Sequence, residues 1–145
     1  MLTLYYAPDT CSLATMIALE EAGAPYETAR IDFSKRQQQS PEYMKLNPKA
    51  RVPALVTERG VLTETPAMLA FVAQSHPAAD LAPLADPFAF AKVQEFNSYI
   101  CSSLHVSHAH RMRGPRWVDP ADTAAIAAMQ RAVPDRMTAS YALIE

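Results

Sequence analysis

Hydrophobic and polar residues alternate at the start of the chain, and the period of the pattern then changes. Residues 2–6 alternate and predict a short strand. A turn containing Pro, Asp and Thr follows at residues 7–10. Apolar residues then recur at helical spacing over 13–20, up to Gly23, and alternation returns over 26–31. Strand, helix and strand in about thirty residues predict a right-handed βαβ unit.

The next forty residues add a second group of elements. Residues 34–39 are polar and predict a loop or an irregular helical turn, and a short helix follows over 40–46 with a serine cap and proline in its first turn. Two apolar strands are predicted over 52–56 and 61–63, and another helix begins at residue 64 or 65. This order predicts an α/β domain with a mixed sheet and helices on both faces.

The remainder of the chain changes to a purely helical pattern. A linker rich in proline covers residues 77–87, and a long helix is predicted over 88–111. Gly114-Pro115 ends that helix, Asp119-Pro120 begins the next, and Pro134 interrupts it. We therefore predict an α/β domain over 1–76, a linker over 77–87 and an all-α domain over 88–145. Because the last residues keep a helical register, the all-α domain is expected to be incomplete.

Composition narrows the class of protein. The chain has 145 residues, 50% of them hydrophobic and 19% charged, which favours a folded core over disorder. Its net charge of −2 lacks the basic character of a nucleic-acid-binding protein. We find no apolar stretch of membrane-spanning length and no signal peptide, and we expect a cytoplasmic protein that does not bind membranes. Two distant cysteines, Cys11 and Cys101, suggest no disulfide framework.

Cys11 is the first candidate for chemistry, because it stands just before the first predicted helix. Unpaired N–H groups and a positive macrodipole at a helix start stabilise a thiolate. The alternative is a buried structural cysteine. The positions three residues away are Pro8 and Ala14, so no second thiol lies nearby to resolve a mixed disulfide. A redox cycle would need an external thiol, which points towards glutathione.

Two further motifs could bind a peptide-like ligand. A cis bond between Val52 and Pro53 would present the Val52 backbone as an added strand would, although an ordinary trans proline is the alternative. Thr65 and the following helix start can hold a carboxylate, and Glu64 can pair with an amine; plain helix capping explains the same residues. Tyr5 and Ser12 are alternative hydroxyl groups for activating a bound thiol, or else core and capping residues.

Three histidines in the predicted long helix invite a metal-site interpretation. The chain offers no cysteine at zinc spacing and no His-Glu-x-x-His motif, so we predict no metal. His105 shares a helix face with apolar residues and could line a cleft, whereas Cys101 is expected to pack in the helical core. The three histidines are His105, His108 and His110.

Taken in order, these features resemble the glutathione transferases, and among them the bacterial beta class. The resemblance covers the entire chain. It is carried by Tyr5-x-Ala7-Pro8-x-x-Cys11-Ser12-Leu13-Ala14, Asn47-Pro48-Lys49-x-Arg51-Val52-Pro53-Ala54-Leu55, Leu62-Thr63-Glu64-Thr65-Pro66-Ala67 and Glu95-Phe96 through Ser102-x-Leu104-His105.

The resemblance implies a thioredoxin-like first domain with a four-stranded mixed sheet and a cis Pro53. It implies that Cys11 is the catalytic residue, contacts the glutathione sulfur and can form a mixed disulfide with it. Glutathione is then the co-substrate, a small electrophile or disulfide is the second substrate, and the protein is a homodimer active in detoxification. The residues implied in glutathione binding are Tyr5, Ser12, Lys35 or Arg36, Arg51, Val52, Pro53, Glu64, Thr65, Ser102 and His105.

Several positions depart from the family pattern. Thr65 replaces a serine but keeps the hydroxyl group, and Arg51 replaces a glutamine and adds charge near the peptide site. Val106 stands where a lysine is common, and Ser98 where an asparagine is common, which affects contacts of the helical domain more than Cys11. Family members also continue through further helices beyond residue 145.

Three functions remain to be compared. The first is an enzyme that uses glutathione for conjugation to electrophiles or for thiol-disulfide exchange through Cys11. The second is a non-catalytic glutathione transferase-like binding or regulatory protein. The third is an isomerase or dehalogenase, since related folds carry a Ser-Cys pair here, but the order Cys11-Ser12 argues against it.

Overall fold

The computed structural model describes residues 1–144. The chain divides into two compact units, Met1–Ala91 and a second that begins at Lys92. This boundary lies inside helix α4 (Pro87–Tyr99), which starts in the first unit and ends in the second. The predicted division into a domain, a linker and a helical domain stays a prediction. The linker region contains one short 3₁₀ turn, η2 (Pro77–Ala79).

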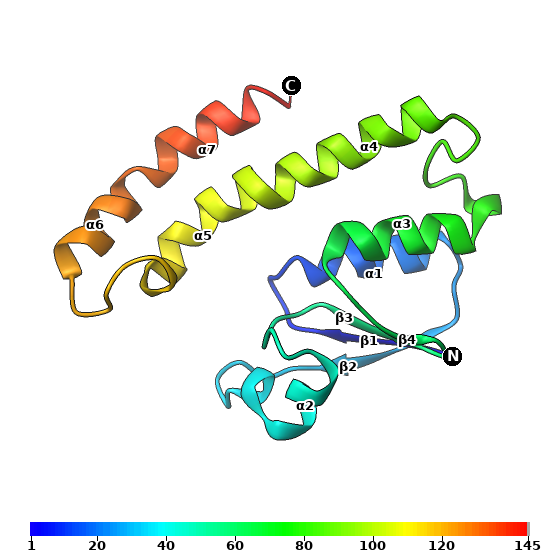
Figure 1. Cartoon of the computed structure of the whole chain (residues 1–145), viewed down its shortest axis with the longest axis horizontal. Helices are drawn as coiled ribbons and strands as arrows, with labels where there is room; N and C mark the ends of the chain where they lie inside the picture. The colour runs from blue at the N-terminus through cyan, green and yellow to red at the C-terminus, as the bar shows by residue number, and fades with distance from the viewer. Residues whose placement is uncertain (145) are drawn as a thin grey trace. The chain divides into compact units, whose positions relative to one another are not determined.

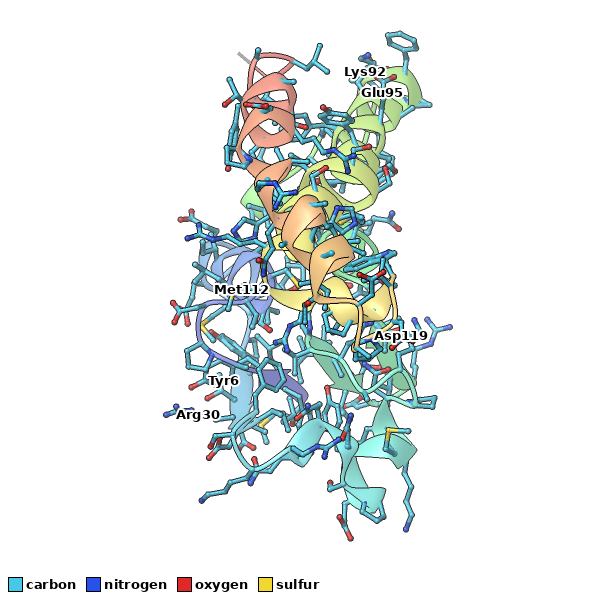
Figure 2. The ribbon with its side chains drawn as sticks, turned by 90° about the vertical axis from the view of Figure 1, so that its left-hand side faces the viewer. Tyr6, Arg30, Lys92, Glu95, Met112 and Asp119 are labelled. Atoms are coloured by element: carbon cyan, nitrogen blue, oxygen red, sulfur yellow. The ribbon has the colours of Figure 1, made fainter. Side chains whose placement is uncertain are left out.

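The first unit is built on a four-stranded sheet of order β2-β1-β3-β4. Its strands are β1 (Leu2–Tyr6), β2 (Tyr26–Arg30), β3 (Ala54–Thr57) and β4 (Gly60–Thr63). β1 and β2 are parallel, whereas β1–β3 and β3–β4 are antiparallel. Figure 2 shows Tyr6 and Arg30, which pair at the ends of β1 and β2. The mixed sheet and its βαβ start are therefore as predicted.

Helices cover both faces of this sheet (Figure 1). Helices α1 (Ser12–Glu21) and α3 (Thr65–Ser75) pack on one face. Between them and the sheet lies a core of fully buried side chains, namely Leu4, Leu19, Leu55, Met68 and Val72. Helix α2 (Pro41–Leu46) covers the other face through Tyr43, which packs with Ile31 and Ala54. This arrangement is a thioredoxin-like fold, as expected.

Local chemistry explains where the elements of this unit begin and end. The Ser40 hydroxyl accepts a hydrogen bond from the backbone N–H of Tyr43 at 3.2 Å and so caps α2. Just beyond the C-terminal end of α1, Gly23 adopts a φ of +60°, which glycine tolerates without steric cost. The polar stretch before α2 forms a 3₁₀ turn, η1 (Gln37–Gln39), as the sequence predicted. The strand expected from Val52 begins two residues later, at Ala54.

The second unit is all-helical over its described residues. The long helix predicted from 88 to 111 is present but not uniform, because a π-helical segment, η3 (Ile100–Leu104), separates α4 from α5 (His105–Arg113). A π segment admits one extra residue into a turn, and hydrophobic spacing did not reveal it. The predicted break at Gly114 is the 3₁₀ turn η4 (Gly114–Arg116).

Two helices follow the break. The one expected from Asp119 instead begins four residues later, as α6 (Thr123–Arg131). The reason is that the Asp122 side chain accepts the backbone N–H of Ala125 at 2.8 Å and acts as the N-cap. The helix is interrupted as predicted, because α6 ends at Arg131 and α7 (Val133–Tyr141) begins after Ala132, with Pro134 in the first turn of α7. Both α6 and α7 pack against α5.

Candidate functional site

Cys11 lies at the N-terminal end of α1, on the turn that leaves β1. The Thr10 hydroxyl donates to the carbonyl of Ala7 at 2.8 Å and closes this turn. Cys11 is the N-cap residue but makes no side-chain capping bond, and its side chain is half-buried. Its sulfur lies 3.7 Å from the carbonyl oxygen of Val52. The thiol is therefore partly open to solvent rather than sealed in apolar packing.

Ser12 is placed differently from its neighbour. Its side chain is fully buried, and its Oγ lies 2.8 Å from the Oγ1 of Thr10. The backbone N–H of Ser12 also points to Thr10 Oγ1 at 3.3 Å. In this arrangement the Ser12 hydroxyl braces the turn and is not exposed to a ligand. Activation of a bound thiol by Ser12 stays a prediction that this geometry does not favour.

The peptide bond between Val52 and Pro53 is cis. Val52 is half-buried and Pro53 is buried, and β3 starts immediately after them. The Val52 carbonyl faces the Cys11 sulfur, so the backbone of this loop and the thiol of α1 meet at one place. The side chain of Arg51, just before them, is exposed.

The loop before this bond is held in place by hydrogen bonds from two buried side chains. The Tyr43 hydroxyl donates to the carbonyl of Arg51 at 2.6 Å, and the Asn47 side-chain amide donates to the same oxygen at 2.7 Å. Asn47 is 1% exposed, and its Oδ1 also accepts the backbone N–H of Lys49 at 3.2 Å. We call Tyr43 and Asn47, the two donors to the Arg51 carbonyl, the loop clamp. Burial raises the pKa of Tyr43, so its hydroxyl stays protonated and remains a donor.

Tyr5 packs on this clamp from the sheet. Its ring lies against that of Tyr43, with 5.6 Å between ring centroids and a tilt of 55°. Tyr5 and Val52 both pack against the buried cluster of Tyr43, Ile31 and Ala54. Tyr5 therefore supports the face of the sheet on which α2 lies, next to the loop that presents Val52.

Glu64 and Thr65 begin α3. Glu64 is the N-cap residue and has a φ of +71°, an unusual conformation for a residue with a side chain. Its carboxylate makes no capping bond; instead it accepts from Lys49 Nζ at 2.6 Å. The same ammonium donates to the Thr63 hydroxyl at 2.8 Å. Pro66 follows Thr65 in the first turn and has no N–H, so it supplies no backbone donor at the helix start.

Lys35 and Arg36 lie in the exposed loop between β2 and α2. Lys35 Nζ is 3.9 Å from Asp32 Oδ2, and Arg36 Nε donates to Gln39 Oε1 at 2.9 Å. The hydroxyl of Ser34 donates to Asp32 at 2.6 Å and lowers the pKa of that carboxyl group. Both basic side chains therefore have local partners within this loop.

Ser102 and His105 belong to the second unit. Ser102 lies in the π-helical segment, with an exposed side chain 3.4 Å from that of Ser103, and His105 is the first residue of α5. Their contribution to the site of the first unit stays a prediction.

Three residues of the first unit were missed as site residues by the sequence reasoning. Lys49 and Asn47 lie inside a motif that the sequence did single out, but nothing in their spacing indicated which groups they would contact. Tyr43 was expected only as part of a helix. The signal that connects them, convergence on Arg51 and Glu64, depends on the loop path and not on sequence distance.

Within 1–144, no group of three or more His, Cys, Asp or Glu side chains is arranged to hold a metal ion. Over the same residues, no helix combines the length and apolar character needed to span a membrane.

Comparison with known proteins places this site in context. Residues 1–74 match the model of the glutathione S-transferase N-terminal domain. Glutathione S-transferase GstA of Escherichia coli is 36% identical over 104 residues, which cover 70% of this chain and 52% of that protein. A Xanthomonas campestris glutathione S-transferase is 31% identical over 102 residues, covering 70% of this chain and 49% of that protein. The chain thus spans about half the length of these curated relatives.

Solved structures agree. A glutathione transferase homolog from Sulfitobacter, crystallised with bound glutathione, is 44% identical with a TM-score of 0.93, covering 99% of this chain and 68% of that one. A beta class glutathione S-transferase from Sphingomonas chungbukensis is 29% identical with a TM-score of 0.78, covering 94% and 67%. With the family model matching more than half of its residues and this fold, the chain belongs to the glutathione S-transferase family.

Proposed function

We propose that this protein binds glutathione on its first unit, with the glutathione sulfur beside Cys11. The observation that carries the proposal is the position of the Cys11 sulfur, at the start of α1 and 3.7 Å from the Val52 carbonyl. A tripeptide that pairs with the Val52 backbone would bring its own cysteine to that sulfur. A Sulfitobacter relative, 44% identical, was crystallised with glutathione, which supports the choice of ligand.

In this proposal the remaining parts of glutathione bind other groups of the chain. The γ-glutamyl carboxylate would take the Thr65 hydroxyl and the start of α3, and the ammonium group would take Glu64. Lys35 or Arg36 would face the glycyl carboxylate, with Arg51 adding positive charge nearby. In this proposal Tyr5 supports the loop, and Ser102 and His105 contribute from the second unit.

We further propose two reactions for the bound thiol. In conjugation, the helix-start potential stabilises the glutathione thiolate, which attacks an electrophile and displaces its leaving group. In exchange with a disulfide between glutathione and a small thiol, the Cys11 thiolate attacks the glutathione sulfur, forms the Cys11–glutathione disulfide and releases the small thiolate. A second glutathione thiolate then attacks the Cys11–glutathione disulfide, regenerates the Cys11 thiolate and leaves as glutathione disulfide, because no second protein thiol lies three residues away.

The wider setting follows from the family and is part of the same proposal. A 29% identical neighbour is a beta class enzyme, and we propose that class for this chain. We also propose a cytoplasmic homodimer that acts on small electrophiles or disulfides in detoxification. Light scattering of the purified protein at micromolar concentration tests the dimer, and a monomer at every concentration would contradict it.

Intact mass spectrometry after incubation with glutathione disulfide tests the role of Cys11. The wild-type protein and the control variant Cys101→Ser are expected to gain one glutathione, and Cys11→Ser none. The control is matched because neither cysteine forms a disulfide and because Cys101, which was wrongly expected to pack in the helical core, is more exposed than Cys11. An adduct on Cys11→Ser that is lost from Cys101→Ser would contradict the assignment.

A second measurement separates the enzyme from the non-catalytic binding protein. Wild-type protein retained on immobilised glutathione is assayed with chlorodinitrobenzene and with glutathione-dependent reduction of a small disulfide. Turnover of either substrate supports the transferase. Retention without turnover of both would favour the binding or regulatory protein instead.

A further inference from the structure

Glu64, the residue proposed to receive the ammonium group of glutathione, already has a cation bound to it. Lys49 Nζ lies 2.6 Å from Glu64 Oε1 and 2.8 Å from Thr63 Oγ1. Lys49 comes from the loop before the cis bond, fifteen residues earlier in the chain than Glu64. Two anchored contacts at these distances define one position for the ammonium group, directly at the start of α3.

The backbone on both sides favours this contact. The Lys49 N–H donates to the buried Asn47 side chain at 3.2 Å, and the next residue, Ala50, has a φ of +53°. Glu64 itself has a φ of +71°. Residues with side chains adopt positive φ at a cost, and such positions concentrate at ligand-binding sites. Both ends of the ion pair are thus set by the fold rather than by chance encounters of long side chains.

The pair is nevertheless open to exchange. The Lys49 side chain is 47% exposed and that of Glu64 is 60% exposed. An exposed ion pair of this kind is weak, because water screens both charges. A second ammonium group arriving from solution can therefore replace Lys49 on the carboxylate, while the Thr63 hydroxyl can keep hold of the lysine.

We propose that Lys49 is a specificity-determining residue, an internal counter-ion that occupies Glu64 until the ammonium group of a γ-glutamyl ligand replaces it. This inference rests on the proposed glutathione site. Since one ammonium replaces another, the wild-type protein gains little from the ligand's amine. The site accordingly discriminates only weakly between glutathione and γ-glutamyl thiols whose amine is acylated, a class that an unpaired Glu64 would reject.

The opposite role is also open to test, because a lysine here could instead attract the α-carboxylate of the ligand. The two roles predict different effects of removing Lys49. A counter-ion to Glu64 weakens binding of the free amine and tolerates the acylated one, so removing it should increase discrimination. A carboxylate contact would favour both ligands equally, so removing it should weaken both and leave their ratio unchanged.

Isothermal titration calorimetry with glutathione and with N-acetylglutathione distinguishes these roles. In Lys49→Met, glutathione is expected to bind about two- to fivefold more tightly, the range that exposed ion pairs span. The dissociation constant of N-acetylglutathione divided by that of glutathione should rise by at least the same factor. Lys45→Met is the matched control, since Lys45 is an exposed lysine of α2 and its loss changes the net charge equally. It should leave the ratio unchanged.

A double-mutant cycle with Glu64→Gln completes the test. If Lys49 acts through Glu64, the effect of Lys49→Met on the ratio disappears in the Glu64→Gln background. An unchanged ratio in Lys49→Met, or weaker glutathione binding by that variant, would overturn the inference while the glutathione site stands. Wild-type protein that binds neither ligand would overturn the glutathione site and this inference together.

Discussion

Removal of the loop clamp gives the sharpest test of how the fold supports the Cys11 site. Tyr43→Phe removes one hydrogen bond, of 2.6 Å, to the Arg51 carbonyl and keeps the ring packed on Tyr5. Asn47→Ala removes the 2.7 Å bond to the same oxygen and the 3.2 Å bond from Lys49. A typical net contribution of about 1 kcal/mol per hydrogen bond gives losses of about 1 and about 2 kcal/mol in the free energy of unfolding.

The two losses should not add. Each single variant leaves the Arg51 carbonyl with one donor from the clamp, whereas the double variant leaves it with neither. Because an acceptor that loses its last partner carries the larger penalty, the double variant should lose about 1 kcal/mol more than the sum. Arg51 precedes Val52, so the loop that presents the Val52 carbonyl should also loosen, and glutathione affinity should fall by about three- to tenfold in the double variant.

Urea unfolding followed by circular dichroism measures the stabilities, and calorimetric titration measures the affinity. Tyr26→Phe is the control, because the Tyr26 hydroxyl donates to Glu20 at 2.7 Å, on an exposed surface away from the loop. It should cost little stability and leave glutathione affinity unchanged. Additive stability losses together with wild-type affinity in the double variant would refute the view that the clamp positions Val52.

Two further outcomes follow from the geometry. Gly114 is buried with an ordinary φ, and a Cβ built on it would lie 3.4 Å from Ile126 Cγ2 and 3.8 Å from Met129 Sδ. Gly114→Ala should therefore change the melting temperature little, whereas Gly114→Leu should lose about 1–3 kcal/mol by over-packing; equal melting temperatures would contradict this. The pKa of Asp32 is lowered from 3.8, first by the hydrogen bond from Ser34, so its stabilising effect is complete above pH 3.8 and is lost as pH falls through the lower, folded-state pKa. Asp32→Asn should flatten the dependence of the urea midpoint on pH below about pH 4, and an unchanged slope would contradict the assignment.

Local patterns in the sequence were enough to predict the elements of the first unit and the place of its thiol. Alternation with period two, helical spacing, the Ser40 cap and the Gly23 stop are local properties, and each acts within a few residues. They were enough to predict the mixed sheet, the helices on both faces and the position of Cys11 before α1. Asp122 shows the limit of local signals, since the helix was predicted to begin at Asp119-Pro120 and the N-cap of α6 is Asp122 instead.

Which side chains meet depends instead on how the elements and loops pack in three dimensions. Cys11 and Val52 are 41 residues apart, yet their sulfur and carbonyl oxygen lie 3.7 Å from each other. Two donors converge on the Arg51 carbonyl, and Lys49 forms an ion pair with Glu64. The Ser12 side chain points inward to Thr10, whereas Cys11 is half-buried. These contacts depend on the path of loops between elements, and hydrophobic periodicity carries no information about that path. Spacing therefore predicted the scaffold, and packing selected the partners of each polar group.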